Sequence, residues 1–486
     1  MLSLLFNSYE FLFLFLPVTF AGFFLLGRCA EKRYATLWLV VASFLFYGYW
    51  NWRYVPLLFA SIVFNYMIGR KIENTRLKKW LILGIAGNLL LLGYFKYTDF
   101  LLANVNAIAG IDYFDLPHIV LPLGISFFTF TQTAYLVDAY RGETANQSFL
   151  TYCEFVTIFP HLIAGPIINH REMIPQFVAY ETFKINYENI AKGITIFAMG
   201  LFKKVVIADT LAIWANDVFL RTESLTFIEA WIGAVSYTFQ LYFDFSGYSE
   251  MAIGLGLIFN LRLPVNFNSP YRAESIIDFW RRWHMTLGTW VRDYLYIPMG
   301  GNKHGEIAKM RNLFLSMGLI GLWHGAGWTF VIWGTMHGIA LMINHQWRRL
   351  RITLPRFVNI GLTFMCVTLL WVFFRAENFN DAWNVIIAMT DVYNTGLPTG
   401  GAWQKYLGAL ADFGVGFTSW KLGTGLTKVI TVLCVLAAAL LILPNPIELL
   451  KSTKFPSYKW EIATVILLFA GILCITTDSP FLYFQF

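Results

Sequence analysis

Apolar runs long enough to cross a lipid bilayer recur along the whole 486-residue chain. A helix needs about 20 such residues to cross about 30 Å of hydrocarbon. Charged residues make up only 13% of the chain, too few to cover a soluble protein of this size. The sequence therefore predicts an all-α polytopic membrane protein and excludes an ordinary soluble enzyme, a disordered chain and a nucleic-acid-binding module. The runs lie near residues 10–27, 36–50, 54–69, 80–96, 117–138, 152–168, 190–208, 226–246, 311–323, 326–345, 357–374, 429–444 and 460–477.

Basic residues gather in short loops between these runs and indicate which side each loop faces. Loops rich in lysine and arginine stay in the cytoplasm. The rule predicts that both termini lie on the periplasmic side, including the aromatic tail 478–486. Residues 376–428 form the only sizeable extramembrane loop, and Lys203 and Lys204 lie inside an apolar run, where the rule gives no assignment. The basic loops contain Arg28, Lys32 and Arg33; Arg70, Lys71, Arg76, Lys78 and Lys79; Arg348, Arg349, Arg351 and Arg356; and Lys451, Lys454 and Lys459.

Common catalytic and ligand-binding motifs are absent from the sequence. There is no Gly-x-Ser-x-Gly elbow, Walker loop, HExxH or dinucleotide fingerprint, and no CxxC pair. His337 and His345 are eight residues apart, about 12 Å along a helix, so they need help from elsewhere to share an ion. No metal site is predicted.

His324 lies in the segment Gly321-Leu-Trp-His-Gly-Ala-Gly-Trp328, between two apolar runs. A polar ring at such a depth is costly unless it faces a cavity or a partner. A neutral imidazole can take a proton from a hydroxyl, which suits a general base in acyl transfer. The alternative is that Gly321 and Gly325 form a small-residue packing surface and that His324 only bonds across it. The sequence leaves both readings open.

A second group of polar residues follows Ser275, which with Asp278 has the form of a helix cap. We expect one helix from Ser275 to about Pro298, with Trp280, Arg281, His284 and Gly288 on one face. His284 has few polar neighbours in the sequence, which favours a site role. The arginines Arg281, Arg282 and Arg292 suit an anionic, phosphate-bearing donor, whereas Trp283, Trp290 and the same arginines also suit an interfacial belt.

The middle of the chain, residues 240–305, is aromatic and glycine-rich and fits no clean membrane span. Non-helical backbone inside a membrane is tolerated only where protein or a water-filled cavity surrounds it. This region is therefore the first candidate for a functional site. Asp244 is expected to pair with an arginine or a histidine, or to line a channel. His161 and His170 flank a Pro and Gly interruption and are predicted to be structural.

These motifs, taken in order, resemble the membrane-bound O-acyltransferases, and within them the AlgI and PatA branch. The similarity covers nearly the whole chain, so residues 1–486 are treated as a single domain with a catalytic core at 240–345. The matching segments are Leu12-Phe-Leu-Phe-Leu-Pro17, Phe95-Lys-Tyr97, His161-Leu-Ile-Ala-Gly-Pro166, Phe243-Asp-Phe-Ser-Gly-Tyr-Ser249, Phe279-Trp-Arg-Arg-Trp-His284, Arg292-Asp-Tyr-Leu-Tyr-Ile297, Gly300-Gly-Asn302, Leu322-Trp-His-Gly-Ala326 and Phe481-Leu-Tyr-Phe-Gln-Phe486.

The resemblance implies a ring of about 11–13 tilted transmembrane helices, with re-entrant or interfacial helices, around a central funnel. It makes His324 the catalytic histidine and gives His284 the upstream position of the pair. It also implies that Tyr483 in the tail accepts the acyl group and passes it to a periplasmic glycan O-acetyltransferase, which is PatB-like or AlgJ- or AlgX-like. An aromatic tail can instead be an interfacial anchor.

These expectations combine into an acetyl transfer across the bacterial inner membrane. Acetyl-coenzyme A is the expected donor and enters from the cytoplasm near Trp280, Arg281 and Arg282, and no bound cofactor is predicted. His324, supported by His284, would deprotonate the acceptor. Differences from alginate members at Met285-Thr-Leu-Gly288 and Gly327 favour peptidoglycan over alginate. The alternatives are a proton-relay transporter, for which no repeat is evident, and a non-enzymatic scaffold of a polysaccharide-modifying complex. Membrane lipid is the other expected partner, and nucleic acid is not expected to bind.

Overall fold

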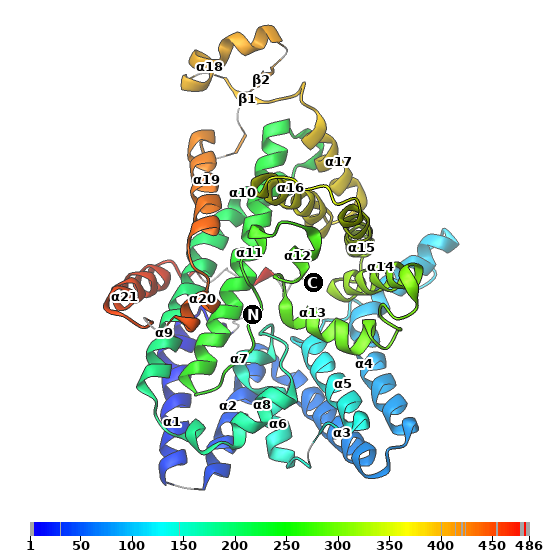
Figure 1. Cartoon of the computed structure of the whole chain (residues 1–486), viewed down its shortest axis with the longest axis vertical. Coiled ribbons are helices and arrows are strands. Elements are labelled where there is room, and N and C mark those ends of the chain that lie inside the picture. Colours follow the sequence, from blue (N-terminus) through cyan, green and yellow to red (C-terminus); the bar gives the residue numbers. More distant parts are fainter. Residues whose placement is uncertain are drawn as a thin grey trace.

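The computed structural model describes residues 4–29, 31–144, 146–399, 401–413, 415–418, 421–422, 424–452, 455–476 and 481–482. Within these ranges the chain is almost entirely helical, as predicted, and the two strands have two residues each. They are β1 (Leu397–Pro398) and β2 (Phe417–Thr418), which pair in parallel. Figure 1 shows them with α18 at one tip of the molecule, beyond α17 and α19.

The described residues of the first half of the chain form ten α-helices. They are α1 (Leu16–Cys29), α2 (Lys32–Asn51), α3 (Val55–Thr75), α4 (Lys78–Ala109), α5 (Ile125–Arg141), α6 (Phe149–Thr157), α7 (Phe159–Leu162), α8 (His170–Val178), α9 (Tyr187–Phe202) and α10 (Asp209–Phe219). The π-helical segment Phe11–Phe15 leads into α1. A second one, Lys203–Ala208, joins α9 to α10. Short 3-10 turns cover Trp52–Tyr54, Tyr180–Phe183 and Thr222–Ser224.

The second half begins with the long helix α11. The helices of this half are α11 (Phe227–Ile258), α12 (Ile276–Trp280), α13 (Met285–Val291), α14 (Gly305–His324), α15 (Trp328–Arg349), α16 (Arg356–Arg375), α17 (Phe379–Thr390), α18 (Gly401–Leu407), α19 (Leu426–Ile442), α20 (Pro446–Lys451) and α21 (Tyr458–Leu473). A π-helical segment, Arg292–Tyr296, extends α13, and 3-10 turns cover Pro270–Arg272 and Gly408–Phe413.

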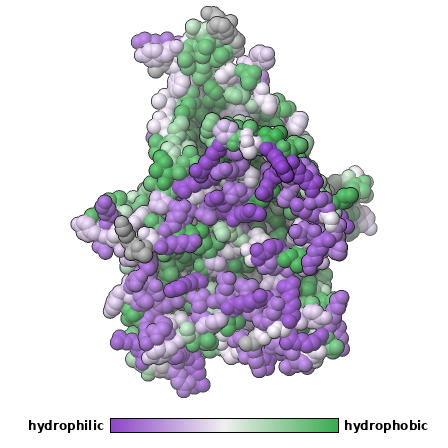
Figure 2. All heavy atoms as spheres, viewed as in Figure 1, coloured by the Kyte–Doolittle hydropathy of each residue, from purple (hydrophilic) through white to green (hydrophobic). Residues whose placement is uncertain are grey.

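Five helical runs in the described part are long and apolar enough to cross a bilayer by themselves. They are Phe11–Cys29, Lys32–Thr75, Lys78–Ala109, Arg356–Arg375 and Leu426–Lys451. Many large apolar side chains of these helices are exposed, as lipid contact requires, and α4 and α19 are the least buried of them. In Figure 2, apolar residues cover the part of the surface that contains α19, while hydrophilic residues gather over the middle and the opposite end of the face shown. The chain is a multi-pass membrane protein.

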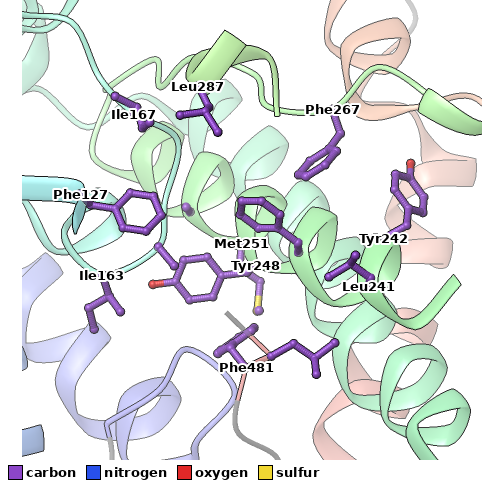
Figure 3. Close-up of a cluster of buried hydrophobic side chains, with 14 of the residues drawn as sticks. Phe127, Ile163, Ile167, Leu241, Tyr242, Tyr248, Met251, Phe267, Leu287 and Phe481 are labelled. Atoms are coloured by element: carbon purple, nitrogen blue, oxygen red, sulfur yellow. The ribbon is translucent and has the colours of Figure 1, made fainter. Parts of the chain in front are cut away.

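Helix α11 runs through the centre of the molecule (Figure 1) and is buried along nearly its whole length. It begins with a capping box in which Thr226 and Glu229 bond to each other's backbone. Glycines allow α9 to pack against it closely: a methyl group on Gly200 would lie 2.4 Å from the carbonyl oxygen of Gly247. In Figure 3 the side chains of Tyr248 and Met251 lie between residues of several other segments. This helix is the frame on which the site is built.

The structure corrects four expectations about the helices. Residues 240–258 continue α11, so the irregular middle region begins only after Ile258. The expected span at 152–168 is broken into α6 and α7 around Ile158, where Pro160 follows. The expected span at 117–138 becomes helical only at Ile125. The helix expected from Ser275 to Pro298 ends at Trp280 and restarts at Met285. The loop at 376–428 contains α17, α18 and both strands, and its extramembrane position stays a prediction.

Candidate active site

His324 is the last residue of α14, and its side chain is only 6% exposed. Its ring lies edge to face against three aromatic rings, with centroid distances of 4.9 Å to Trp323, 5.2 Å to Trp333 and 5.3 Å to Phe374. Gly325 follows in an extended conformation, which ends the helix beside the imidazole. The histidine that the sequence singled out is therefore buried at a helix end and surrounded by aromatic side chains.

Two residues of α4 hold this end of α14 in place. The Lys96 ammonium donates to the carbonyl oxygens of Trp323, at 2.5 Å, and His324, at 2.9 Å. The Tyr97 hydroxyl donates to the carbonyl oxygen of Leu322, at 3.0 Å. The last carbonyls of a helix have no partner within the helix, and a cation there also complements the helix dipole. Lys96 and Tyr97 therefore fix the backbone that carries His324.

Glycines bring α14 and α15 into backbone contact next to His324. A methyl group on Gly321 would lie 2.3 Å from the Phe330 carbonyl oxygen, and one on Gly334 would lie 2.8 Å from the Gly321 Cα. Gly325 makes room for the Phe330 ring instead. The small-residue packing surface considered from the sequence exists between Gly321 and Gly334, and it is compatible with a catalytic histidine at the end of the same helix.

His284 lies in the turn between α12 and α13, fully buried, with a left-handed backbone conformation (φ 44°). Its Nδ1 is 3.0 Å from the Asn266 side-chain oxygen, and its ring lies edge to face on Phe245 at 4.8 Å. That oxygen also accepts from the Thr286 hydroxyl at 2.9 Å. Because an amide oxygen only accepts, His284 Nδ1 carries the hydrogen in the neutral ring, and Nε2 is the basic nitrogen.

The structure brings the two predicted histidines together. His284 and His324 lie close enough to interact electrostatically, although they are on different segments. Trp280, predicted to contact the donor, donates from Nε1 to His337 Nδ1 at 3.3 Å. The Trp333 ring lies between His337 and His324, with centroid distances of 5.0 and 5.2 Å. Trp280 is therefore connected to the histidine pair through an aromatic cluster.

The two arginines after Trp280 are placed differently. Arg282 bonds to Asp278 through Nε at 2.9 Å and to the Asn268 carbonyl oxygen at 3.3 Å, so it joins α12 to the segment before it. Arg281 is exposed and lines a cleft of about 860 Å³ between α12, α15, α16 and the loop 350–355. Arg348 and Arg351 line the same cleft. Of the two arginines, Arg281 is the one available to a ligand.

The other residues singled out from the sequence have contacts that stabilise the fold, lie on the surface, or fall outside the described residues. His161 is buried, with Nδ1 2.8 Å from the Pro166 carbonyl oxygen, and His170 lies 3.5 Å from Asp138. Arg292 pairs with Asp293 on the surface. Tyr483 is outside the described residues. Among those that are described, no three histidine, cysteine or acidic side chains are grouped so that they could hold a metal ion.

Sequence reasoning assigned no role to Lys96, beyond its place in the matching segment Phe95-Lys-Tyr97, and did not single out Asn266, although both shape the site. Lys96 had a usable signal, because a lysine inside a long apolar run must find polar partners. Asn266 lies in a short irregular segment where asparagine is common, and only the fold shows that its side chain orients His284. Both act over long separations in the sequence.

Replacing Lys96 with methionine is expected to weaken the site while keeping the side chain's bulk. Two helix-end carbonyls lose a charged donor, and a hydrogen bond to a charged group contributes about 1.5–3 kcal/mol. We therefore expect a lower melting temperature in detergent and reduced acyl transfer. Lys79→Met is the matched control, since Lys79 is an exposed residue of the same helix. Equal melting temperatures and activities for the two variants would contradict this role.

Comparison with known proteins gives a single family. Residues 44–380 match the model of MBOAT, the membrane-bound O-acyltransferase family. The chain is 48% identical over 428 residues to a peptidoglycan O-acetyltransferase of Helicobacter pylori, covering 81% of each chain. It is 47% identical over 400 residues to a "probable alginate O-acetylase AlgI" of Pseudomonas aeruginosa, covering 79% of this chain and 75% of the relative. A teichoic acid D-alanyltransferase of Streptococcus thermophilus is 26% identical over 48% of this chain. The chain therefore belongs to the membrane-bound O-acyltransferase family.

Proposed function

We propose that this acyltransferase moves an acetyl group from a cytoplasmic donor across the bacterial inner membrane for O-acetylation of a periplasmic polysaccharide, with peptidoglycan favoured over alginate. The observation that carries the proposal is the buried His324 at the end of α14, near the buried His284 of the turn between α12 and α13, in a family of acyltransferases. The similarity to a peptidoglycan O-acetyltransferase supports the choice of acceptor. The alternative, alginate, is supported by similarity to the AlgI proteins at nearly the same identity.

In this proposal His324 is the general base. A neutral imidazole within hydrogen-bonding distance of a hydroxyl removes its proton as the oxygen attacks the acetyl carbonyl carbon. His284 supports it, since the bond from Nδ1 to Asn266 leaves Nε2 as its basic nitrogen. The aromatic rings around His324 keep bulk water from competing as an acceptor. The same proton returns to the leaving thiolate, which restores the neutral pair.

Tyr483 is the proposed acyl acceptor. A phenol with an unperturbed pKa of about 10 needs a base to become nucleophilic at neutral pH. The residues just before it, Phe481 and Leu482, are 1% and 8% exposed, and Phe481 packs beside Tyr248 of α11 (Figure 3). These two tail residues are therefore inside the protein and not free on a surface. This supports a tail that works inside the protein, from which a periplasmic glycan O-acetyltransferase partner takes the acetyl group.

The cleft beside α12 is the proposed entrance for the donor, acetyl-coenzyme A. Arg281, Arg348 and Arg351 offer three guanidinium groups to its phosphates, and Trp347 also lines the cleft. The cleft's two acids are already neutralised, since Glu274 pairs with Arg356 and Asp278 with Arg282. The arginines of the loop after α15 are the ones predicted to face the cytoplasm, which agrees with a cytoplasmic donor.

Changing Arg281 to glutamine is expected to raise the KM for acetyl-coenzyme A about tenfold with little change in kcat, because one charge-assisted bond to phosphate is worth about 1.5–3 kcal/mol. Arg282→Gln is the matched control: it breaks the bond to Asp278 and should lower stability more than it changes KM. The measurement is steady-state acetyl transfer at varied donor concentration. An unchanged KM in the Arg281 variant would contradict the proposal that the donor enters through this cleft.

The identity of the acetylated polysaccharide is tested in a bacterial strain from which the gene for its own polysaccharide O-acetyltransferase of this family has been deleted. Expression of this chain with its periplasmic partner is expected to restore O-acetyl groups on muropeptides, measured by liquid chromatography and mass spectrometry. Acetylation of alginate without any change in muropeptides would overturn the preferred acceptor and favour the alternative. Unacetylated polysaccharide of both kinds, with the protein present in the membrane, would contradict the proposed function.

A further inference from the structure

Two neighbouring lysines, Lys203 and Lys204, form ion pairs with α11 in the interior of the protein. Lys203 Nζ lies 2.5 Å from Glu250 Oε1, and Lys204 Nζ lies 2.7 Å from Asp244 Oδ1. Lys204 also contacts Asp209 at 2.9 Å. Asp244 and Lys204 are each only 2% exposed, so their charges depend on each other in apolar surroundings. The sequence predicted that Asp244 pairs with an arginine or a histidine or lines a channel, and this was wrong about the residue type, because the partner is a lysine.

The packing of α9 against α11 explains why these pairs form. A methyl group on Gly247 would lie 2.7 Å from the Gly200 carbonyl oxygen and 3.2 Å from the Lys204 backbone nitrogen. The backbones therefore touch at this point, where the π-helical segment Lys203–Ala208 begins. A π-helical turn inserts a residue into the helix and changes which side chains face the partner, so two consecutive lysines both reach α11.

The Lys204–Asp244 pair also binds the C-terminal tail. The Leu482 backbone N–H donates to Asp244 Oδ2 at 3.1 Å. The Lys204 ammonium lies 5.0 Å from the centre of the Phe481 ring, and that ring meets Tyr248 edge to face at 4.4 Å. The two oxygens of Asp244 therefore have different partners, because Oδ1 binds Lys204 and Oδ2 binds the tail.

The neighbouring pair differs in this respect. No hydrogen bond, ion pair or ring contact joins Lys203 or Glu250 to Phe481 or Leu482, the tail residues that the structure describes. Both pairs join a lysine of the π-helical segment to a carboxylate of α11, and both are largely buried, although Lys204 has a second acid, Asp209. Of the two pairs, only Lys204–Asp244 contacts Phe481 and Leu482, which makes the other pair a natural control.

We propose that Asp244 and Lys204 are positioning residues that hold the C-terminal tail inside the protein and so keep the acyl acceptor within reach of His324. The inference rests on the proposed function in one respect, namely that Tyr483 is the acceptor. Tyr483 follows Leu482 in the sequence, so anchoring the Leu482 amide limits how far the phenol can travel. A carboxylate accepting a backbone N–H forms a charge-assisted bond, which is stronger than a neutral one.

Asp244→Asn separates the two interactions of this side chain. An asparagine side chain has one accepting oxygen, and the Lys204 ammonium is expected to donate to it. The amide NH2 then faces the Leu482 N–H, so two donors meet and the tail loses its anchor. Glu250→Gln makes the same chemical change in the neighbouring pair and leaves the contacts of Phe481 and Leu482 intact.

The anchor is tested by the reactivity of a cysteine at position 482, which keeps the backbone N–H and the Phe481 ring. Leu482→Cys is introduced after Cys29, Cys153, Cys366, Cys434 and Cys474 have been replaced with serine or alanine. Leu482 is 8% exposed, so slow labelling by N-ethylmaleimide is expected. Asp244→Asn should accelerate labelling at least about tenfold, the effect of losing a bond of about 1.4 kcal/mol or more. Glu250→Gln should leave the rate unchanged.

Equal labelling rates in the Asp244 and Glu250 variants would overturn the anchor. If Asp244→Asn does not fold, as judged by size-exclusion chromatography, Phe481→Ala replaces it, because that change removes the ring without unpairing a buried charge. It should also accelerate labelling of the cysteine, and an unchanged rate would reject the anchor.

Acetylation in the same variants tests the positioning role. Asp244→Asn should lose most acetyl transfer to the polysaccharide, whereas Glu250→Gln should keep it at equal protein amounts. Faster labelling with normal acetylation would overturn the positioning role. Failure of the proposed relay is a different result: Tyr483→Phe would then acetylate normally, while the labelling rates would still report whether the tail is anchored.

Discussion

Replacing His324 with alanine is expected to lower acetyl transfer about 10²–10⁴-fold, the range that a positioned general base supplies. The imidazole is at the end of α14, with rings of Trp323, Trp333 and Phe374 around it, and alanine leaves these walls in place. The protein should therefore reach the membrane in normal amounts and bind the donor with a similar KM. The loss is measured as kcat with purified protein and as O-acetyl content in cells.

His345→Ala is the matched control for this variant, because His345 is a histidine of α15 that is partly exposed and was not assigned to the site. It should keep wild-type activity. If His324→Ala retained normal acetylation at normal protein amounts, the histidine would be a packing residue of the contact between α14 and α15. The proposed mechanism would then be wrong.

Replacing Tyr483 with phenylalanine is expected to abolish acetylation of the polysaccharide. The change removes one oxygen and keeps an aromatic ring, so an interfacial anchor would be unaffected. If the phenol oxygen carries the acetyl group, its loss removes the covalent route, and no other side-chain adjustment restores it. The expected result is background acetylation with normal amounts of protein in the membrane.

Tyr458→Phe makes the same substitution at an exposed tyrosine at the start of α21 and should have no effect. Normal acetylation in the Tyr483 variant would refute the relay and leave His324 to act on a different hydroxyl. Measuring O-acetyl groups released from purified polysaccharide by mild base separates the two outcomes.

Local patterns in the sequence predicted much of the fold because lipid restricts what a chain can do. Long apolar runs became helices, and Ser275 caps α12 as expected, with its side chain accepting from the Asp278 backbone. The break at His284 was missed because residues 276–287 contain no proline or glycine to signal it. A left-handed histidine there depends on Asn266, which holds both the ring and the Met285 backbone N–H. Such contacts have no local signature.

The sequence predicted which residues belong to the candidate site better than it predicted how they are arranged in space. His324 stood out because a polar ring in an apolar sequence needs a reason to be there. Its support by Lys96, more than two hundred residues earlier, depends on how α4 packs against α14. The same holds for the pair of Lys204 and Asp244: the sequence shows two charges in apolar runs, and only the packing of α9 on α11 shows that they meet.

The most direct test of the account is the mass of the C-terminal peptide after purified protein has been incubated with acetyl-coenzyme A. Wild-type protein is predicted to gain one acetyl group on that peptide, and the gain should disappear in His324→Ala and in Tyr483→Phe. Fragmentation should place the group on the Tyr483 oxygen. An unmodified wild-type peptide in a preparation that acetylates the polysaccharide, or equal modification in His324→Ala, would contradict the account.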